Sequence, residues 1–183
     1  DILNPDLENN RTLQDVYDDA AFAEGLLINA YRRIPDNSLS YLEVATDNAV
    51  TNDKFSSFRN MATGQWSAMY NPVEQWTNAF TAINYINLFL KHIDSVEWSI
   101  LDSVKGRLFY ERNKGEAYGL RALFMFYLLQ AHAGYVGDQL MGVPILTEFV
   151  DTKTIEQLQR NTFEECINQI YSDIAEAEKY LPL

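Results

Sequence analysis

The polar connection between residues 36 and 71 holds the side chains of this sequence that are best suited to binding a ligand. Trp66, Tyr70 and Asn71 lie at its end, just before a predicted helix, and Asn, Asp, Ser, Thr and Gly recur around them. Sugar rings present C–H faces that stack on aromatic planes, and sugar hydroxyl groups pair with amide, carboxylate and ammonium groups. Tyr and Trp combine such a plane with a polar tip. The composition is therefore typical of a carbohydrate-binding surface.

A structural role is the alternative for each of these three residues. Trp66 and Tyr70 would then pin the connection to the core, and Asn71 would only cap the following helix. A connection of this length without regular structure is often functional in a compact domain. Further polar groups come from four residues that are equally explained as solvated loop positions: Asp47, Asn48, Asn52 and Lys54.

Glu116 and Arg121 are charged residues within an otherwise apolar helical stretch. Burying a charge is costly unless it is paired, so each is expected to meet a group from a neighbouring segment. They lie five positions apart, which places them on different sides of the helix and prevents a simple pair. No motif supplies a second catalytic carboxylate, so a structural role is favoured over acid–base catalysis. Asn87 is likewise interpreted as a buried amide bonded to backbone.

No metal, cofactor or catalytic site is predicted. His92 and His132 are far apart and neither has the spacing of a metal ligand. Cys166 is the single cysteine, so no disulfide can form within the chain, and its position beside an apolar stripe predicts a buried thiol. Nucleophile motifs, phosphate loops and dinucleotide fingerprints are absent from the sequence.

The charge balance excludes two classes of partner. The chain has 183 residues, enough for one domain, and a formal net charge of −12. Nucleic acids and anionic membrane surfaces require a basic face, so neither is expected to bind directly. The acidity is most simply explained by solubility.

Residues 114–135 are the apolar part of the predicted central helix, which is expected to begin near Val104–Lys105 and to continue to about Ala133. Almost every position from 117 to 131 is apolar, and a helix that is apolar all round is buried. The unbroken apolar run is shorter than the about 20 residues that a membrane span needs. Gly115, Gly119 and Ala122 return to one side of the helix, so a neighbouring helix is expected to approach closely there.

Three further helices have clear boundaries. The first begins at Asp18 as N-cap and ends before Pro35. The second is predicted over Pro72–Ile93, with Asn71 as its N-cap. The last begins with a capping box of Thr162 and Glu165. Its apolar stripe is Phe163, Ile167, Ile170, Ile174, Ala177 and Leu181.

The sequence therefore predicts one all-α domain, with tetratricopeptide-like helical hairpins around a buried central helix and with long irregular loops. Its expected parts are an extended leader (1–17), a first helix (18–35), a long loop region (36–71) and a helical scaffold (72–183). Within the scaffold, residues 142–146 are expected to lie extended against the core, and residues 147–161 to form a polar, flexible connection.

Three blocks of residues, in this order, resemble the N-terminal part of the SusD/RagB family. The resemblance runs from about residue 16 to the end. The blocks are Trp76-x3-Phe80-x2-Ile83-x3-Asn87-x2-Leu90; Gly115-Glu116-Ala117-Tyr118-x2-Arg121-Ala122 with Gly134 and Gly142-Val143-Pro144 following; and Arg160-x-Thr162-x2-Glu165 with Asp173-Ile174 following. The middle block is the most specific of the three.

The resemblance implies a cell-surface function. SusD-like proteins are helical, nutrient-binding lipoproteins of the outer membrane of Bacteroidetes. They bind glycans, face the cell exterior, and sit as lids on a SusC-like TonB-dependent transporter. They are not enzymes, and a lipid on an N-terminal cysteine anchors them. That cysteine and the C-terminal half of the family are not found in these 183 residues. An N-terminal domain of such a glycan-binding protein is therefore expected.

Two other functions remain open from the residues alone. A helical-repeat scaffold could serve protein contacts without a ligand of its own. An α-helical glycoside hydrolase is the least favoured alternative, because no pair of catalytic carboxylates is signalled.

Overall fold

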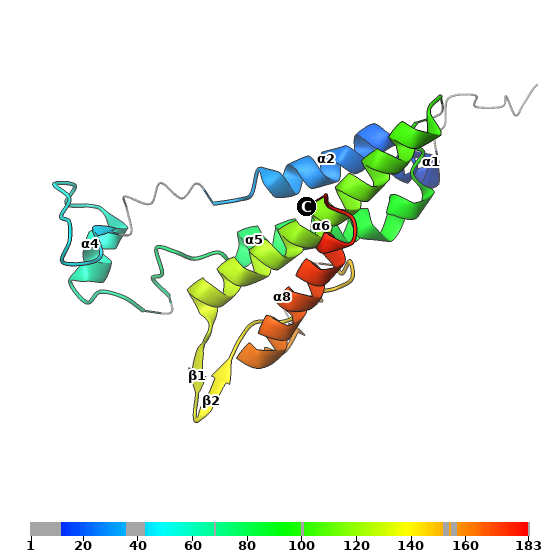
Figure 1. Ribbon diagram of the computed structural model, residues 1–183. Helices are drawn as coiled ribbons and strands as arrows, with labels where there is room; N and C mark the ends of the chain where they lie inside the picture. Colours follow the sequence, from blue (N-terminus) through cyan, green and yellow to red (C-terminus); the bar gives the residue numbers. More distant parts are fainter. Residues whose placement is uncertain are drawn as a thin grey trace, which may run out of the picture.

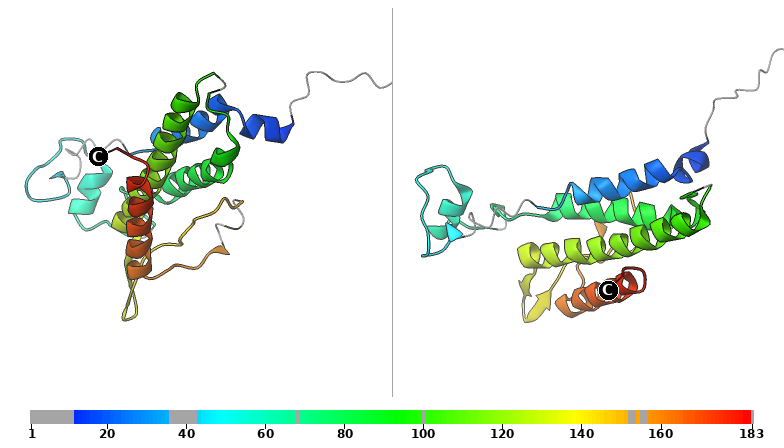
Figure 2. Two further views of the ribbon diagram at one scale, coloured as in Figure 1. Left: turned by 45° about the vertical axis from the view of Figure 1, so that its right-hand side comes forward. Right: turned by 45° about the horizontal axis from the view of Figure 1, so that its top comes forward.

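Four long helices lie side by side, each antiparallel to the one before it (Figures 1 and 2). They are α2 (Ala20–Tyr31), α5 (Trp76–His92), α6 (Ser103–His132) and α8 (Phe163–Glu178). This computed structural model describes residues 12–35, 43–67, 69–99, 101–151, 154 and 157–182. Helix α6 packs against α5 on one side and α8 on the other, and α2 packs against α5. The predicted helical fold around a central helix is confirmed.

Helix α6 has the predicted extent. The Asp102 side chain caps it by accepting hydrogen bonds from the N–H groups of Val104 and Lys105. Most of its buried residues lie in its second half, but Phe126 in that half is 45% exposed, so one side of the helix faces solvent. Within the described residues, no helix combines the length and apolar composition of a membrane span.

The N-terminal part differs from the prediction. Residues 13–17 form a short helix, α1 (Leu13–Tyr17), instead of an extended leader, and residues 1–11 lie outside the described part. A capping box between Thr12 and Asp15 starts α1. Asp18 therefore ends α1, and Asp19 is the cap that accepts from the first N–H groups of α2.

Helix α5 begins at Trp76, four residues later than predicted, and Asn71 is not its cap. The Asn71 side-chain oxygen accepts from the N–H of Val73 instead, which holds the chain in a turn (3.0 Å). The Glu74 carboxylate accepts from the N–H groups at the start of the helix. Glu74 therefore fills the capping role that was predicted for Asn71, while Asn71 holds the turn before the helix.

A β-hairpin follows α6, and the sequence analysis did not predict it. Strands β1 (Gly134–Val136) and β2 (Gln139–Met141) pair antiparallel. Gly137 has a φ of 61° in the tight turn, which is a conformation that favours glycine. Gly134 begins the first strand and Gly137 permits the turn, so both glycines shape this hairpin.

The segment 142–146 lies extended against the core, as predicted. Val143 and Leu146 are buried, and Asn161 bonds this segment through both its backbone and its side chain. The Cys166 thiol is buried and donates to the Val143 carbonyl (3.3 Å), which confirms the expected buried thiol.

The capping box of Thr162 and Glu165 at the start of α8 is confirmed. The apolar stripe was only partly right. Ile170 and Ala177 are buried, but Ile174 is 40% exposed, and Asp173 is buried in its place. The buried side of α8 is thus rotated at two positions, from Ile167 to Cys166 and from Ile174 to Asp173, while Ile170 and Ala177 stay in it.

Arg121 explains this rotation. Its Nε and Nη2 atoms donate to the two carboxylate oxygens of Asp173 at 2.9 and 2.6 Å. Its Nη1 atom donates to the Asn87 side-chain oxygen (2.9 Å) and the Thr147 carbonyl (3.3 Å). The side chains of Arg121 and Asp173 are 8% and 2% exposed. The expectation that Arg121 meets neighbouring segments is confirmed, and the pair joins α6 to α8.

Glu116 meets a group from a neighbouring helix, Tyr31 of α2, as expected, and it also forms an ion pair within its own helix. Its carboxylate accepts from Arg112 one helical turn earlier (2.7 Å), so its ion pair lies within α6. Burial and a hydrogen bond to Glu116 raise the pKa of Tyr31, on α2, to about 12. Asn87 donates to the carbonyls of Leu146 and Glu148, as predicted for a buried amide.

Replacing Asp173 by alanine should destabilise the fold by about 3–5 kcal/mol, because the Arg121 guanidinium would be left buried without its partner. Chemical denaturation of the purified chain measures this change. Lys179→Ala removes an exposed ion pair with Glu176 on the same helix and serves as the control. Equal midpoints for the two variants would contradict a structural role for the buried pair.

Two glycines of α6 should respond oppositely to alanine. A Cβ at Gly115 would lie 2.6 Å from Leu181 Cγ and 3.2 Å from the Ala177 carbonyl oxygen, whereas one at Gly119 would meet nothing within 4 Å. Gly119→Ala should therefore stabilise the protein by about 0.5–1 kcal/mol through helix propensity. Gly115→Ala should lower the thermal unfolding midpoint. The pair of midpoints is the measurement, and a gain at Gly115 would refute the close approach.

Candidate functional site

Residues 43–67, 69 and 70 form an outer lobe that lies beyond the end of the helical bundle (Figure 1). The lobe contains the short helix α4 (Ser57–Ala62). None of its described residues is buried. The Gln65 N–H donates to the Asn60 carbonyl (2.9 Å), and Ser67 and Tyr70 form an isolated β-bridge. The long connection predicted here is thus a partly folded projection.

The two helices that flank the outer lobe in the sequence, α2 and α5, are bonded to each other near the lobe. The Asn78 amide donates to the Arg33 carbonyl (2.6 Å), and the Arg33 guanidinium donates to the Asn78 side-chain oxygen (3.4 Å). These reciprocal bonds tie the end of α2 to the start of α5. The two ends of the connection therefore leave the bundle from one place.

Asn71 joins the outer lobe to the end of α6. Its side-chain N–H donates to the Ala131 carbonyl (3.0 Å), while its side-chain oxygen holds Val73. Nearby, the backbone N–H of Gln75 donates to Nε2 of His132 (3.0 Å). Both side-chain groups of Asn71 are engaged with backbone, so its chemistry is that of an anchor.

Trp66 and Tyr70 are the half-exposed aromatic residues of the lobe. Trp66 is 50% exposed and Tyr70 is 41% exposed. The Tyr70 hydroxyl accepts from the Asn60 amide (3.2 Å), which fixes the ring against α4. The rings are thus presented to solvent without being packed into the core.

The other predicted site residues lie in the same lobe. Asp47, Asn48 and Lys54 are exposed. The Asn48 amide donates to the Glu43 carboxylate (3.0 Å), and its backbone N–H donates to Thr46 Oγ1. The structure therefore places all six predicted residues in the outer lobe or at its base.

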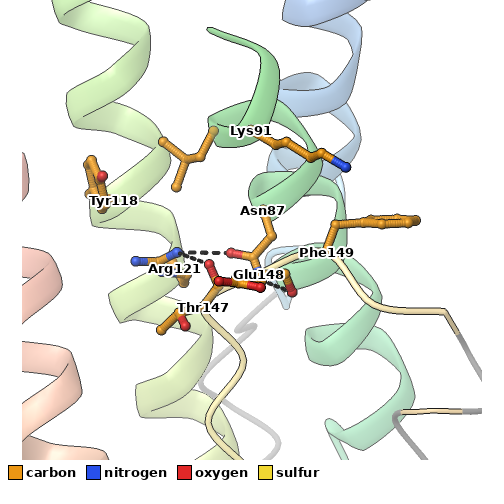
Figure 3. A pocket seen from close by; sticks show the side chains of 8 residues that line it. Asn87, Lys91, Tyr118, Arg121, Thr147, Glu148 and Phe149 are labelled. Atoms are coloured by element: carbon orange, nitrogen blue, oxygen red, sulfur yellow. Dashed lines mark hydrogen bonds between the residues drawn. The ribbon is translucent and has the colours of Figure 1, made fainter. Parts of the chain in front are cut away.

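A cavity of about 390 Å³ lies on the bundle itself, between α5, α6 and the segment after Leu146 (Figure 3). Asn87 and Arg121 form its floor, and Tyr118 stands on the α6 side. The Arg121 guanidinium carbon lies 5.2 Å from the centre of the Tyr118 ring, a cation–π contact. Lys91 and Phe149 lie on the α5 side of the cavity.

Sequence reasoning missed this cavity because residues 147–150 were interpreted as flexible. Asn84 accepts from the Val150 N–H (3.0 Å) and donates to its carbonyl (2.7 Å). Asn87 and Arg121 hold the carbonyls of Glu148 and Thr147. A partial signal was present in the sequence: Asn84 and Asn87 lie three residues apart, on one side of α5, among apolar core positions.

Metal binding finds no support in the described part of the chain, where no group of three or more His, Cys, Asp or Glu side chains could hold an ion. His92 stacks on Tyr17 with ring centres 4.0 Å apart. His132 contacts Trp76 edge to face. Both histidines have structural contacts.

The sequence from residue 6 to residue 183 matches the SusD-like family, described as starch-binding proteins associating with the outer membrane. A search of curated proteins found no match.

Solved structures share the fold. A SusD-like protein from Bacteroides fragilis is 21% identical, with a TM-score of 0.71 over 91% of this chain and 30% of its own. A laminarin-binding SusD-like protein is 20% identical, with a TM-score of 0.68 over 91% of this chain and 35% of its own. A protein from Bacteroides vulgatus described as a putative sugar-binding protein is 24% identical, with a TM-score of 0.67 over 88% and 37%. The chain thus spans about a third of the length of these structures.

The bond from Gln75 to His132 makes the junction at the lobe's base sensitive to pH. Burial is the main cause that lowers the pKa of His132 below 6.5, the nearby Arg160 lowers it further, and Glu74 opposes them. Neutral Nε2 accepts the Gln75 N–H, and a protonated ring cannot. The folded state is therefore favoured above pH 6.5, and this contribution is lost as the pH falls from 6.5 through the lowered pKa.

A nuclear magnetic resonance titration should give His132 a pKa below 6.5. The free energy of unfolding of His132→Gln should depend less on pH in this window than that of the wild type. His92 is present in both proteins, so its own titration cancels in the comparison. A His132 pKa above 6.5 would mean that its pairing with Glu74, 4.0 Å away, outweighs burial.

Proposed function

The chain belongs to the SusD-like family, and from this premise we propose that it provides a glycan-binding surface on the exterior of a bacterial outer membrane. The observation that carries the proposal is the outer lobe, where Trp66 and Tyr70 are half exposed among carboxylate, amide and ammonium side chains. The printed descriptions of similar structures, a laminarin-binding protein and a putative sugar-binding protein, support a carbohydrate ligand.

Each residue of the lobe has a distinct part in the proposal. Trp66 stacks on the face of a sugar ring, and the Tyr70 ring adds a second apolar surface. Asp47, Asn48 and Lys54 supply acceptors and donors for sugar hydroxyl groups. Asn71 positions the two rings, because its side chain is bonded to Ala131 and Val73.

The charge of the chain favours neutral glycans. A net charge of −12 repels sulfated or uronic acid polymers at long range. Starch and laminarin are uncharged, so they are suitable first probes.

The proposed partner is a SusC-like TonB-dependent transporter, with the protein held at the outer membrane by a lipid anchor. Binding and delivery, not hydrolysis, is the proposed activity. The carboxylates of Asp173, which is buried, and of Glu116, which is partly buried, are engaged by Arg121 and Arg112. Neither is therefore available as a catalytic acid or base.

Trp66→Ala should weaken glycan binding by about tenfold, through the loss of one aromatic contact. Affinity electrophoresis in gels with starch or laminarin, followed by calorimetry, measures the effect. Tyr171→Ala is the control, because Tyr171 is exposed on α8 in the bundle.

Unchanged affinity in Trp66→Ala would remove this residue from the site. Release of reducing sugar by the purified protein would contradict the binding role. Retention of a transporter without any glycan affinity would favour a pure protein scaffold.

A further inference from the structure

We propose that the cavity between α5, α6 and residues 147–149 is a second glycan subsite, which holds one uncharged sugar unit. This inference rests on the proposed function but uses residues separate from the outer lobe. The volume of about 390 Å³ lies near the lower end of the range of small-molecule sites. It therefore suits a short part of a glycan, such as one ring or a chain end.

The wall of the cavity is preorganised. Residues 146–150 have no regular secondary structure, yet side chains of two helices hold their backbone. Asn84 binds both polar groups of Val150, Asn87 binds the carbonyls of Leu146 and Glu148, and Arg121 binds the carbonyl of Thr147. A wall fixed in this way loses little conformational freedom when a ligand binds.

The groups around the opening are free to bind a ligand. Lys91, Thr147 and Glu148 are exposed, and Tyr118 is half buried. Among the described residues, the Lys91 ammonium, the Glu148 carboxylate and the hydroxyl groups of Thr147 and Tyr118 form no hydrogen bond. Donors and acceptors are therefore both available, which matches the hydroxyl groups of a sugar.

Apolar surfaces complete the lining. The Tyr118 ring stands on the α6 side, and Phe149, which is 44% exposed, lies on the α5 side (Figure 3); Leu90 also lines the cavity. Aromatic faces beside hydroxyl-binding groups suit the C–H face of a sugar ring.

The charged side chains that line the cavity do not give it an excess of either sign. The Arg121 guanidinium is paired with Asp173, and the cavity carries one ammonium group from Lys91 and one carboxylate from Glu148. A ligand with a net charge would meet a like charge as well as an opposite one. An uncharged ligand is therefore favoured over an acidic sugar or a phosphate.

Nuclear magnetic resonance of the isotope-labelled 183-residue chain tests the proposal. The probes are maltohexaose, laminarihexaose and cellohexaose. The backbone amides of Thr147 to Val150 and the Asn87 side chain report on the cavity, and the Trp66 indole N–H reports on the outer lobe. With at least one probe, the cavity signals should shift in a saturable way, and they should still do so in Trp66→Ala.

Phe149→Ala should raise the dissociation constant measured at the Asn87 side chain by about tenfold, as expected for the loss of one aromatic contact. The matched control is Phe126→Ala on α6, since Phe126 is 45% exposed and Phe149 is 44% exposed. Phe126 does not line the cavity, so its variant should bind like the wild type.

The outcomes separate the two proposals. If the Trp66 signal responds and the cavity signals stay fixed, the second subsite is refuted and the function of the outer lobe stands. If the cavity responds and Trp66 does not, the subsite is supported and the lobe loses its assigned role. If no probe moves either set of signals, both proposals fail. Equal affinities of Phe149→Ala and Phe126→Ala would also overturn the subsite.

Discussion

The buried pairing of Arg121 with Asp173 is the constraint on which the rest of the bundle depends. One guanidinium group contacts α8 through Asp173, α5 through Asn87 and the following loop through Thr147. A charge in this position is tolerated only if every contact is made, because an unpaired ion in a core is strongly destabilising. The pair therefore selects which faces of the three helices meet, and this selection explains why Asp173 takes the inward position while Ile174 faces solvent.

The same polar network separates a rigid frame from an attached lobe. Asn87 accepts a hydrogen bond from Arg121 and donates one to the Leu146 carbonyl, where the loop begins. The helix packing and the loop conformation are therefore set together. The outer lobe shares none of these contacts. Asn71, directly after the lobe, bonds the Ala131 carbonyl, and Arg33 with Asn78 joins the two helices that flank the lobe in the sequence. The frame thus supplies fixed geometry, and the lobe supplies exposed aromatic surface.

Local signals predicted most of the fold. The capping box at Thr162 and the apolar run in α6 each act within a few residues, and both were predicted from the sequence. The predictions that failed concerned either two neighbouring residues that suit the same role or bonded residues that lie far apart in the sequence. Asp18 and Asp19 are both good caps, and the capping box of α1 decides between them. The composition of the outer lobe was also visible in the sequence. Asn84 and Asn87 were visible as polar positions of α5, but no local periodicity reveals that they bond the carbonyls of Val150 and Glu148, about 60 positions later.

The closed base of the outer lobe has an evolutionary consequence. Because Arg33 and Asn78 already bring the end of α2 to the start of α5, the chain between them can change in length without moving either helix. The entropy of closing a longer loop grows slowly, by about 0.6 kcal/mol for each doubling. Descendants of such a sequence can therefore exchange the whole lobe and acquire new ligands while inheriting one unaltered frame.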